Sequence, residues 1–131
     1  MIVVDASVLA NAVGDDGDTG SRHRAVLGEA VGLAVPDLAY VETVAALRRR
    51  WLAGDLPLDR FEAAVVDLID LPLDAYTTAP LLARVVELRD TLTAYDAVYV
   101  ALAEALGCDL VTADRRLATA SGVTCPVRVV G

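Results

Sequence analysis

The stretch Met1-Ile2-Val3-Val4-Asp5-Ala6-Ser7 decides how the rest of this chain is interpreted. Residues 2–4 form an apolar, β-branched run without polar alternation, which is typical of a strand buried on both faces of a parallel sheet. The run ends at Asp5, and a helical pattern begins at Ser7. Such an acid either caps the following helix or contributes to a ligand site, because open α/β sheets bind ligands at the carboxyl ends of their strands. These seven residues leave both roles open.

Composition narrows the class of protein. The chain has 131 residues, of which 56% are hydrophobic, and its mean hydropathy of +0.51 excludes general disorder. This length predicts one domain over residues 1–131. No apolar run approaches the roughly 20 residues that span a bilayer, and the N-terminus does not resemble a signal peptide, so we expect a cytoplasmic protein without membrane contact. Cys108 and Cys125 lack metal-ligand spacing and are interpreted as small buried thiols.

The charge pattern excludes several functions. The net charge is −8, and all eleven basic residues are arginine. Without lysine, the chain has no Walker A phosphate loop and no Schiff-base lysine. An acidic chain does not attract nucleic acid by bulk charge, so phosphate binding would depend on local arginines or on bound cations. The candidate phosphate contacts, each of them equally compatible with a solvated helix or a partner-protein contact, are Arg22, Arg24, Arg48, Arg49, Arg50, Arg115 and Arg116.

Short β-rich segments alternate with helical ones along the chain. Strands are predicted at residues 2–4, 33–35, 110–112 and 126–130, with a minor strand at 73–75. Helices are predicted at residues 7–13, 21–31, 38–52, 58–71, 79–89, 94–106 and 115–120. This alternation predicts an α/β/α sandwich, in which helices flank a mainly parallel central sheet. No GxGxxG motif follows the first strand, which argues against a dinucleotide site.

Three expectations concern individual side chains. His23, the single histidine, lies in an arginine-flanked first turn and is expected at the surface. The inward faces of two helices are assigned to apolar stripes, and the helix that begins after Thr93 is apolar almost all round, so its tyrosines are expected to pack in the core. The side chains assigned to the core in this way are Leu38, Val41, Ala45 and Leu52, then Leu58, Phe61, Val65, Leu68 and Ile69, and finally Tyr95 and Tyr99.

Four acids are placed where they could share one crevice. Asp5 and Asp114 each follow a predicted buried strand, Asp96 opens the buried helix, and Glu42 lies beside an apolar stripe. Glu42 could alternatively form an ion pair with Arg49, two turns further along its helix. Clustered carboxylates repel one another and either raise their pKa values or bind a cation, and oxygen ligands without His or Cys favour Mg²⁺ or Mn²⁺. Such a site indicates phosphodiester hydrolysis, in which the metal activates water and stabilises the leaving oxyanion.

These acids occur within sequence motifs that resemble a known family. The motifs, in order, are Val4-Asp5-Ala6-Ser7-Val8-Leu9, Pro36-Asp37-Leu38 leading to Glu42, Tyr95 to Ala103, and Leu110-Val111-Thr112-Ala113-Asp114-Arg115-Arg116-Leu117. Together they resemble a PIN domain over essentially the whole chain, and the small size resembles the VapC toxins of toxin–antitoxin pairs.

The resemblance implies an RNA-cleaving enzyme that depends on Mg²⁺ or Mn²⁺. Its acidic set would fall on Asp5, Glu42, Asp96 and Asp114, with Ser7 and Thr112 at the assisting hydroxyl positions. The resemblance also implies a homodimer that a VapB-type antitoxin holds inactive. Arg48, Arg49, Arg115 and Arg116 are the favoured candidates for contacts with RNA or antitoxin.

Two other classes of function were weighed against a ribonuclease toxin. An inert binding or regulatory module would explain the negative charge, but it would retain a costly acidic set without catalytic use. A phosphatase of the aspartyl-phosphate type needs a second acid two residues after its nucleophilic Asp, and usually a lysine. Ser7 occupies that position here, and the chain has no lysine.

Overall fold

Five short strands form a sheet in which every neighbouring pair is parallel. The computed structural model describes residues 1–131. Its strands are β1 (Ile2–Val4), β2 (Leu33–Pro36), β3 (Leu73–Tyr76), β4 (Asp109–Thr112) and β5 (Val127–Val129), in the spatial order β3-β2-β1-β4-β5. The predicted mainly parallel sheet is confirmed, and the pairing is parallel throughout.

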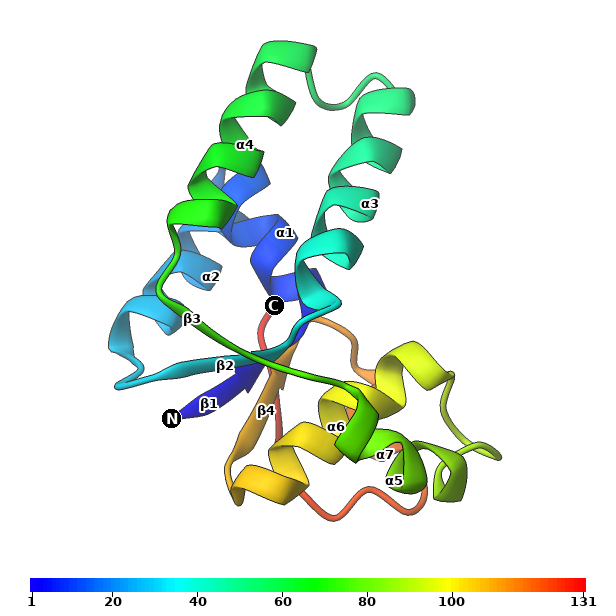
Figure 1. Ribbon diagram of the computed structural model, residues 1–131. Helices are drawn as coiled ribbons and strands as arrows, with labels where there is room; N and C mark the ends of the chain where they lie inside the picture. The colour runs from blue at the N-terminus through cyan, green and yellow to red at the C-terminus, as the bar shows by residue number, and fades with distance from the viewer.

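Helices cover both faces of the sheet, which confirms the predicted sandwich (Figure 1). The helical elements are α1 (Ala6–Gly14), α2 (Asp18–Glu29), α3 (Ala39–Leu52), α4 (Leu58–Asp70), the 3-10 turn η1 (Ala79–Leu81), α5 (Leu82–Glu87), α6 (Ala94–Leu106) and α7 (Arg116–Thr119). Helices α1 to α4 lie on one side of the sheet, and α5 and α6 lie on the other. None of the helices is both long and apolar enough to cross a membrane.

The strand order reverses direction beside β1. The chain moves outward from β1 through β2 to β3, then returns through α5 and α6 to place β4 on the other side of β1. The backbone N–H of Asp5 donates to the carbonyl of Val111 at 2.9 Å, so the ends of β1 and β4 stay joined. A reversal of this kind leaves a crevice at the carboxyl ends of the two strands, where open α/β sheets bind ligands.

Helix α6 begins and ends as the sequence predicts. The Thr93 hydroxyl accepts a hydrogen bond from the backbone N–H of Asp96 at 3.2 Å. Gly107 closes the helix with φ of +65°, a left-handed conformation that glycine adopts without steric cost. Helix α2 differs from its prediction, because it begins at Asp18 rather than at Ser21, and the loop before it is shorter. The predicted helix at 79–89 is divided into η1 and α5.

The burial of α3 corrects the predicted apolar stripe. Val41 is 73% exposed and Leu52 is 59% exposed, while the buried residues are Ala39, Thr43 and Leu47. The stripe follows apolar residues at helical spacing, but the inward face carries Ala39, Thr43 and Leu47, which lie four positions apart and include a polar residue. Thr43 fits there because its hydroxyl donates to the Ala39 carbonyl at 2.7 Å, so no buried polar group stays unpaired.

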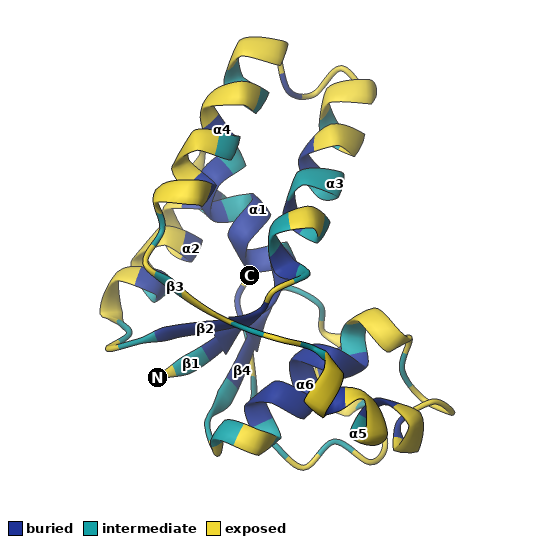
Figure 2. Cartoon of the chain, in the orientation of Figure 1, coloured by how far each residue is buried: buried dark blue, intermediate teal, exposed yellow.

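Figure 2 shows that α1 and β2 lie among buried residues, whereas α4 is exposed over much of its length. Other expected positions are also wrong. His23 is fully buried, where its ring nitrogens face the Thr19 carbonyl and the Asn11 amide. Tyr95 is 63% exposed because it lies on the solvent side of the first turn of α6, whereas Tyr99 is buried as expected. On α4, Leu58 and Ile69 face solvent because the inward positions are Ala64 and Leu68. The two cysteines are half-buried free thiols, and burial raises the pKa of Cys125 to about 11.

Candidate active site

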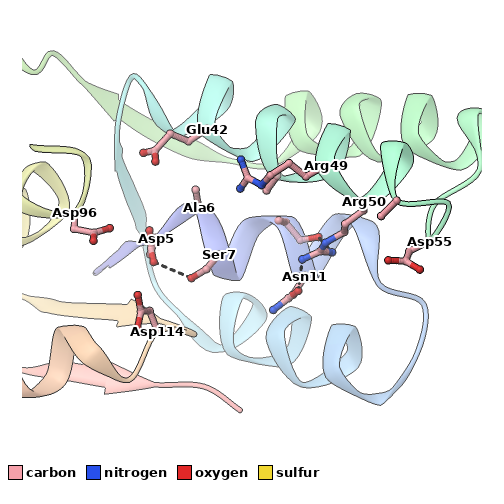
Figure 3. A pocket seen from close by; sticks show the side chains of 13 residues that line it. Asp5, Ala6, Ser7, Asn11, Glu42, Arg49, Arg50, Asp55, Asp96 and Asp114 are labelled. Atoms are coloured by element: carbon pink, nitrogen blue, oxygen red, sulfur yellow. Dashed lines mark hydrogen bonds between the residues drawn. The ribbon is translucent and has the colours of Figure 1, made fainter. Parts of the chain in front are cut away.

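A cleft of about 480 Å³ lies at the carboxyl ends of β1 and β4, between α1, α3 and the start of α6. The structure brings all four predicted acids into its lining (Figure 3). They come from four separate segments of the chain and meet only through the fold. The full lining is Asp5, Ala6, Ser7, Ala10, Asn11, Glu42, Ala46, Arg49, Arg50, Ala53, Asp55, Asp96 and Asp114.

Asp5 is the most deeply buried of the four acids, at 7% exposure. It occupies the position before the first turn of α1, but its side chain forms no capping hydrogen bond with that helix. Its Oδ2 instead accepts from the hydroxyls of Ser7, at 2.8 Å, and Thr112, at 2.7 Å. The carboxylate is therefore fixed by side chains at the floor of the cleft rather than used as a helix cap.

Ser7 and Thr112 also hold the backbone that follows β4. The Ser7 hydroxyl oxygen accepts from the N–H of Ala113 at 3.0 Å, and the Thr112 hydroxyl oxygen accepts from the N–H of Asp114 at 3.0 Å. Each hydroxyl therefore donates to Asp5 and accepts from the chain that leads to Asp114. This places the two hydroxyls predicted to assist between two of the acids, where they set the spacing of the strand ends.

Glu42 and Asp96 carry negative charge that the chain does not balance. Burial raises the pKa of Glu42, and the charges of Asp5 and Asp96 raise it further. Burial likewise raises the pKa of Asp96, with additional repulsion from Asp5 and Asp114. The buried hydroxyl of Tyr99 donates to Glu42 Oε1 at 2.8 Å and partly offsets the rise in the pKa of Glu42. The alternative ion pair between Glu42 and Arg49 does not form.

Asp114 is the exception, because it has a cation of its own. The Arg116 guanidinium donates to both carboxylate oxygens, with Nη2 at 2.6 Å from Oδ2 and Nε at 3.0 Å from Oδ1. These hydrogen bonds lower the pKa of Asp114. Arg116 is 86% exposed, so the bond lies at the mouth of the cleft.

The donor set suits a hard divalent cation in its chemistry. Carboxylate oxygens without His or Cys favour Mg²⁺ or Mn²⁺, and a cation would relieve the repulsion that raises the pKa values of Glu42 and Asp96. No three acidic, histidine or cysteine side chains already stand close enough to enclose an ion. The residues therefore fit a divalent cation by their chemistry and do not form a closed, preformed cage.

Comparison with known proteins decides the family. The PIN domain family model matches residues 2–123. Ribonuclease VapC9 of Mycobacterium tuberculosis is 41% identical over 130 residues, which cover 99% of this chain and 98% of the relative. This chain is a PIN domain of the VapC family.

Solved structures agree with this PIN-domain assignment at the level of the fold. The crystal structure of VapC20 from Mycobacterium tuberculosis, described as a sarcin-ricin loop cleaving toxin, superimposes with a TM-score of 0.73 at 16% identity and covers 95% of this chain and 97% of its own. The VapBC2 structure from Rickettsia felis, bound to a promoter DNA fragment, gives a TM-score of 0.69 at 14% identity and covers 98% of each chain.

The candidate arginines of this PIN domain are divided between the cleft and other surfaces. Arg49 and Arg50 line the cleft, whereas Arg48 and Arg115 do not. Arg116 reaches the cleft only through Asp114. Two candidates form hydrogen bonds away from the cleft. Arg22 donates to the Gly131 carbonyl, and Arg24 donates to the carbonyls of Ala12 and Asp15.

Asn11, Asp55 and Tyr99 are polar lining or supporting residues of the PIN domain that sequence reasoning missed. Asn11 lies four residues after Ser7, so the two share one face of α1, and that spacing was a usable signal. Tyr99 was assigned to packing alone. Its hydrogen bond to Glu42 joins residues 57 positions apart, and no local pattern indicates it.

Proposed function

We propose that this chain is a divalent-metal-dependent endoribonuclease that hydrolyses RNA phosphodiester bonds. The observation that carries the proposal is the cleft in which Asp5, Glu42 and Asp96 share uncompensated negative charge. The name of its relative, Ribonuclease VapC9, supports the same reaction class at 41% identity. An acidic cleft repels RNA unless bound cations make its local electrostatic potential positive. An RNA substrate therefore requires a bound metal ion.

Each acid has a separate role in this proposal. Asp5, Asp96 and Asp114 would hold Mg²⁺ or Mn²⁺, and Glu42 would complete the shell through water. When bound, such an ion lowers the pKa of water and stabilises the leaving oxygen of an in-line displacement. Ser7 and Thr112 fix the orientation of the Asp5 carboxylate, and Tyr99 fixes that of Glu42.

A cation bound to Asp114 would compete with Arg116 for the same carboxylate oxygens. Its hydrogen bonds satisfy both carboxylate oxygens of Asp114, so this acid is less available than the other three. We propose that Arg116 turns outward when Asp114 binds metal. The exposure of the Arg116 side chain leaves room for that movement.

We also propose that a VapB-type antitoxin is a protein partner of this chain. Structural neighbours include VapBC2 and a toxin–antitoxin complex from Klebsiella pneumoniae. Large apolar side chains of α3 and α4 face solvent, and a partner that covered these two helices would remove them from water. These side chains are Val41, Trp51, Leu52, Leu58, Val66 and Ile69. The expected homodimer stays a prediction.

Cleavage of total cellular RNA by the purified chain tests the proposed reaction. The reactions would contain Mn²⁺, Mg²⁺ or EDTA, and Asp96→Asn would control for contaminating nuclease. We expect discrete fragments that require both the metal and Asp96. No cleavage of any RNA pool by folded protein would overturn the ribonuclease proposal and favour an inert module.

A further inference from the structure

The cleft has two ends of opposite character. The four acids of the proposed metal site lie at one end, and two arginines lie at the other (Figure 3). The apolar part of the lining consists of small alanine side chains. These alanines are Ala6, Ala10, Ala46 and Ala53. The volume of about 480 Å³ lies within the usual range for small-ligand sites.

Arg50 is held in the cleft wall by a directed chain of hydrogen bonds. Its Nη2 donates to Asn11 Oδ1 at 2.7 Å, and its Nη1 donates to the Ala10 carbonyl at 3.3 Å. The Asn11 amide nitrogen lies 3.4 Å from His23 Nε2, and His23 Nδ1 lies 2.7 Å from the Thr19 carbonyl oxygen. A carbonyl can only accept, so Nδ1 carries the proton and Nε2 accepts from Asn11. The Asn11 oxygen is therefore fixed toward Arg50.

Arg49 differs from Arg50 because its guanidinium binds nothing in the chain. It forms no ion pair, and it donates to no carbonyl or side chain. Figure 3 shows its side chain directed back along α3 toward Glu42. Its charge lowers the pKa of Glu42, although the two side chains do not pair. Arg49 is thus a free cation that lies inside the cleft, on the side that faces the acids.

The charges of the cleft suit a phosphodiester strand. If the acid end takes the scissile phosphate, as the proposed function requires, a strand that leaves this end toward Arg49 brings a neighbouring phosphate to its guanidinium. Arginine guanidinium groups bind phosphate oxygens through paired donors. Asp55 lines the cleft beyond Arg50, and its negative charge repels any further phosphate.

We propose that Arg49 forms a subsite for one RNA backbone phosphate adjacent to the bond that is cleaved. Arg50, oriented by Asn11 and His23, forms the wall of this subsite and adds a second positive charge. The subsite gives the strand a direction through the cleft, which the acids alone do not provide.

The test compares Arg49→Ala with Arg48→Ala. The two arginines are adjacent, exposed residues of α3, and each substitution removes one positive charge. Only Arg49 lines the cleft. The assay measures binding of a fluorescein-labelled pool of random single-stranded oligoribonucleotides in Mg²⁺. Every protein carries Asp96→Asn to prevent turnover, and the Mg²⁺ concentration is raised to offset the weaker metal binding expected of that substitution. We expect Arg49→Ala to weaken binding about tenfold and to reduce the salt dependence by about one phosphate contact, and Arg48→Ala to change binding less than about twofold.

Equal effects of the two substitutions, or a larger effect of Arg48→Ala, would overturn the subsite. Binding of poly-glutamate that depends on Arg49, while RNA binding does not, would assign this end of the cleft to an acidic protein segment and also overturn the proposal. The binding comparison does not use cleavage, so failure of the proposed ribonuclease activity would be seen separately, in the wild-type reactions with Mn²⁺.

Discussion

Helix α6 carries two acids in opposite environments. Asp96 lies in its first turn, where burial and neighbouring carboxylates raise its pKa. Glu104 lies near its other end, where Arg84 Nε donates at 2.7 Å and the Thr124 N–H donates at 2.9 Å. These bonds lower the pKa of Glu104 to about 2. Glu104 therefore has an arginine as its ion-pair partner, whereas Asp96 has none.

The difference separates a structural acid from one available to a ligand. Arg84 also donates to Glu87 and to the Gly122 carbonyl, so its ion pair with Glu104 joins α5, α6 and the loop before β5. Asp96 accepts no comparable bond from a cation, and its charge is a cost to the fold that a bound cation would remove. Substitutions at the two positions should therefore have opposite consequences.

The largest expected effect is on catalysis, at the uncompensated acid. Asp96→Asn keeps the shape of the side chain and removes its charge. We expect metal-dependent cleavage to fall about 100-fold or more, because loss of a supporting residue of a metal site already costs 10- to 100-fold. The melting temperature should stay the same or rise, since a buried charge is removed. Cleavage rates in Mn²⁺ and thermal unfolding measure the two effects, and a wild-type rate would contradict the assignment.

At Glu104, which is paired with Arg84, we expect a substitution to reduce stability and to leave catalysis unchanged. Glu104→Gln removes the charge that holds Arg84 and Thr124, and should lower the free energy of unfolding by about 2–3 kcal/mol, as for hydrogen bonds to charged groups. Cleavage per folded molecule should not change. Urea unfolding and cleavage below the melting transition provide the measurements. A loss of activity without a loss of stability would reverse the roles of the two acids.

The pH dependence of stability sharpens the same comparison. The pKa of Glu104 falls from 4.5 to about 2 in the folded chain. A lowered carboxyl pKa stabilises the fold above the unfolded pKa and loses this contribution as the pH falls through the folded pKa. The stability difference between wild type and Glu104→Gln should be constant near pH 6 and shrink between about pH 4.5 and 2. Urea titrations at stepped pH test this, and a constant difference down to pH 2 would refute it.

A smaller effect on cleavage is expected at Tyr99, whose neutral hydroxyl holds the cleft acid Glu42. Tyr99→Phe removes the hydroxyl that donates to Glu42, so the pKa of Glu42 should rise further and its orientation should loosen. We expect about a tenfold loss of cleavage rate, with a stability change of about 1 kcal/mol. Tyr95→Phe is the matched control, because Tyr95 is exposed on the same helix. Equal rates for the two variants would exclude a positioning role for Tyr99.

The smallest effect is expected at the acid with an exposed cation. Arg116→Gln frees Asp114, so the Mn²⁺ concentration for half-maximal cleavage should fall about threefold, in keeping with the small contribution of exposed ion pairs. Arg115→Gln removes the same charge from the neighbouring residue and should have no such effect. A Mn²⁺ requirement that rises in Arg116→Gln would instead indicate that Arg116 supports the site.

Much of the fold was predictable because the local signals agree with the tertiary structure. The buried runs at β1, β2 and β4, the Thr93 cap and the Gly107 stop each specify their element locally. The same signals selected Asp5 and Asp114, since an acid directly after a buried strand of a parallel sheet lies at the ligand edge. Their catalytic role stays a proposal.

The errors arise where a polar residue lies on the inward face of a helix or where contacts are distant in sequence. The inward face of α3 carries Ala39, Thr43 and Leu47, so Val41 and Leu52 face outward. His23 is buried with its ring nitrogens facing Asn11 and Thr19. The arginines that flank it in the sequence predict a surface position instead. The hydrogen bond from Tyr99 to Glu42 likewise depends on the packing of α6 against the rest of the fold.

Binding of Mn²⁺ tests most directly whether the cleft acids lack a counter-charge that a metal supplies. Calorimetric titration of the wild-type chain, Asp96→Asn and Glu104→Gln, without RNA, would compare the two acids of α6. We expect Asp96→Asn to weaken Mn²⁺ binding more than about tenfold and Glu104→Gln to leave it unchanged. Equal binding by all three proteins, or no binding by the wild type, would contradict it.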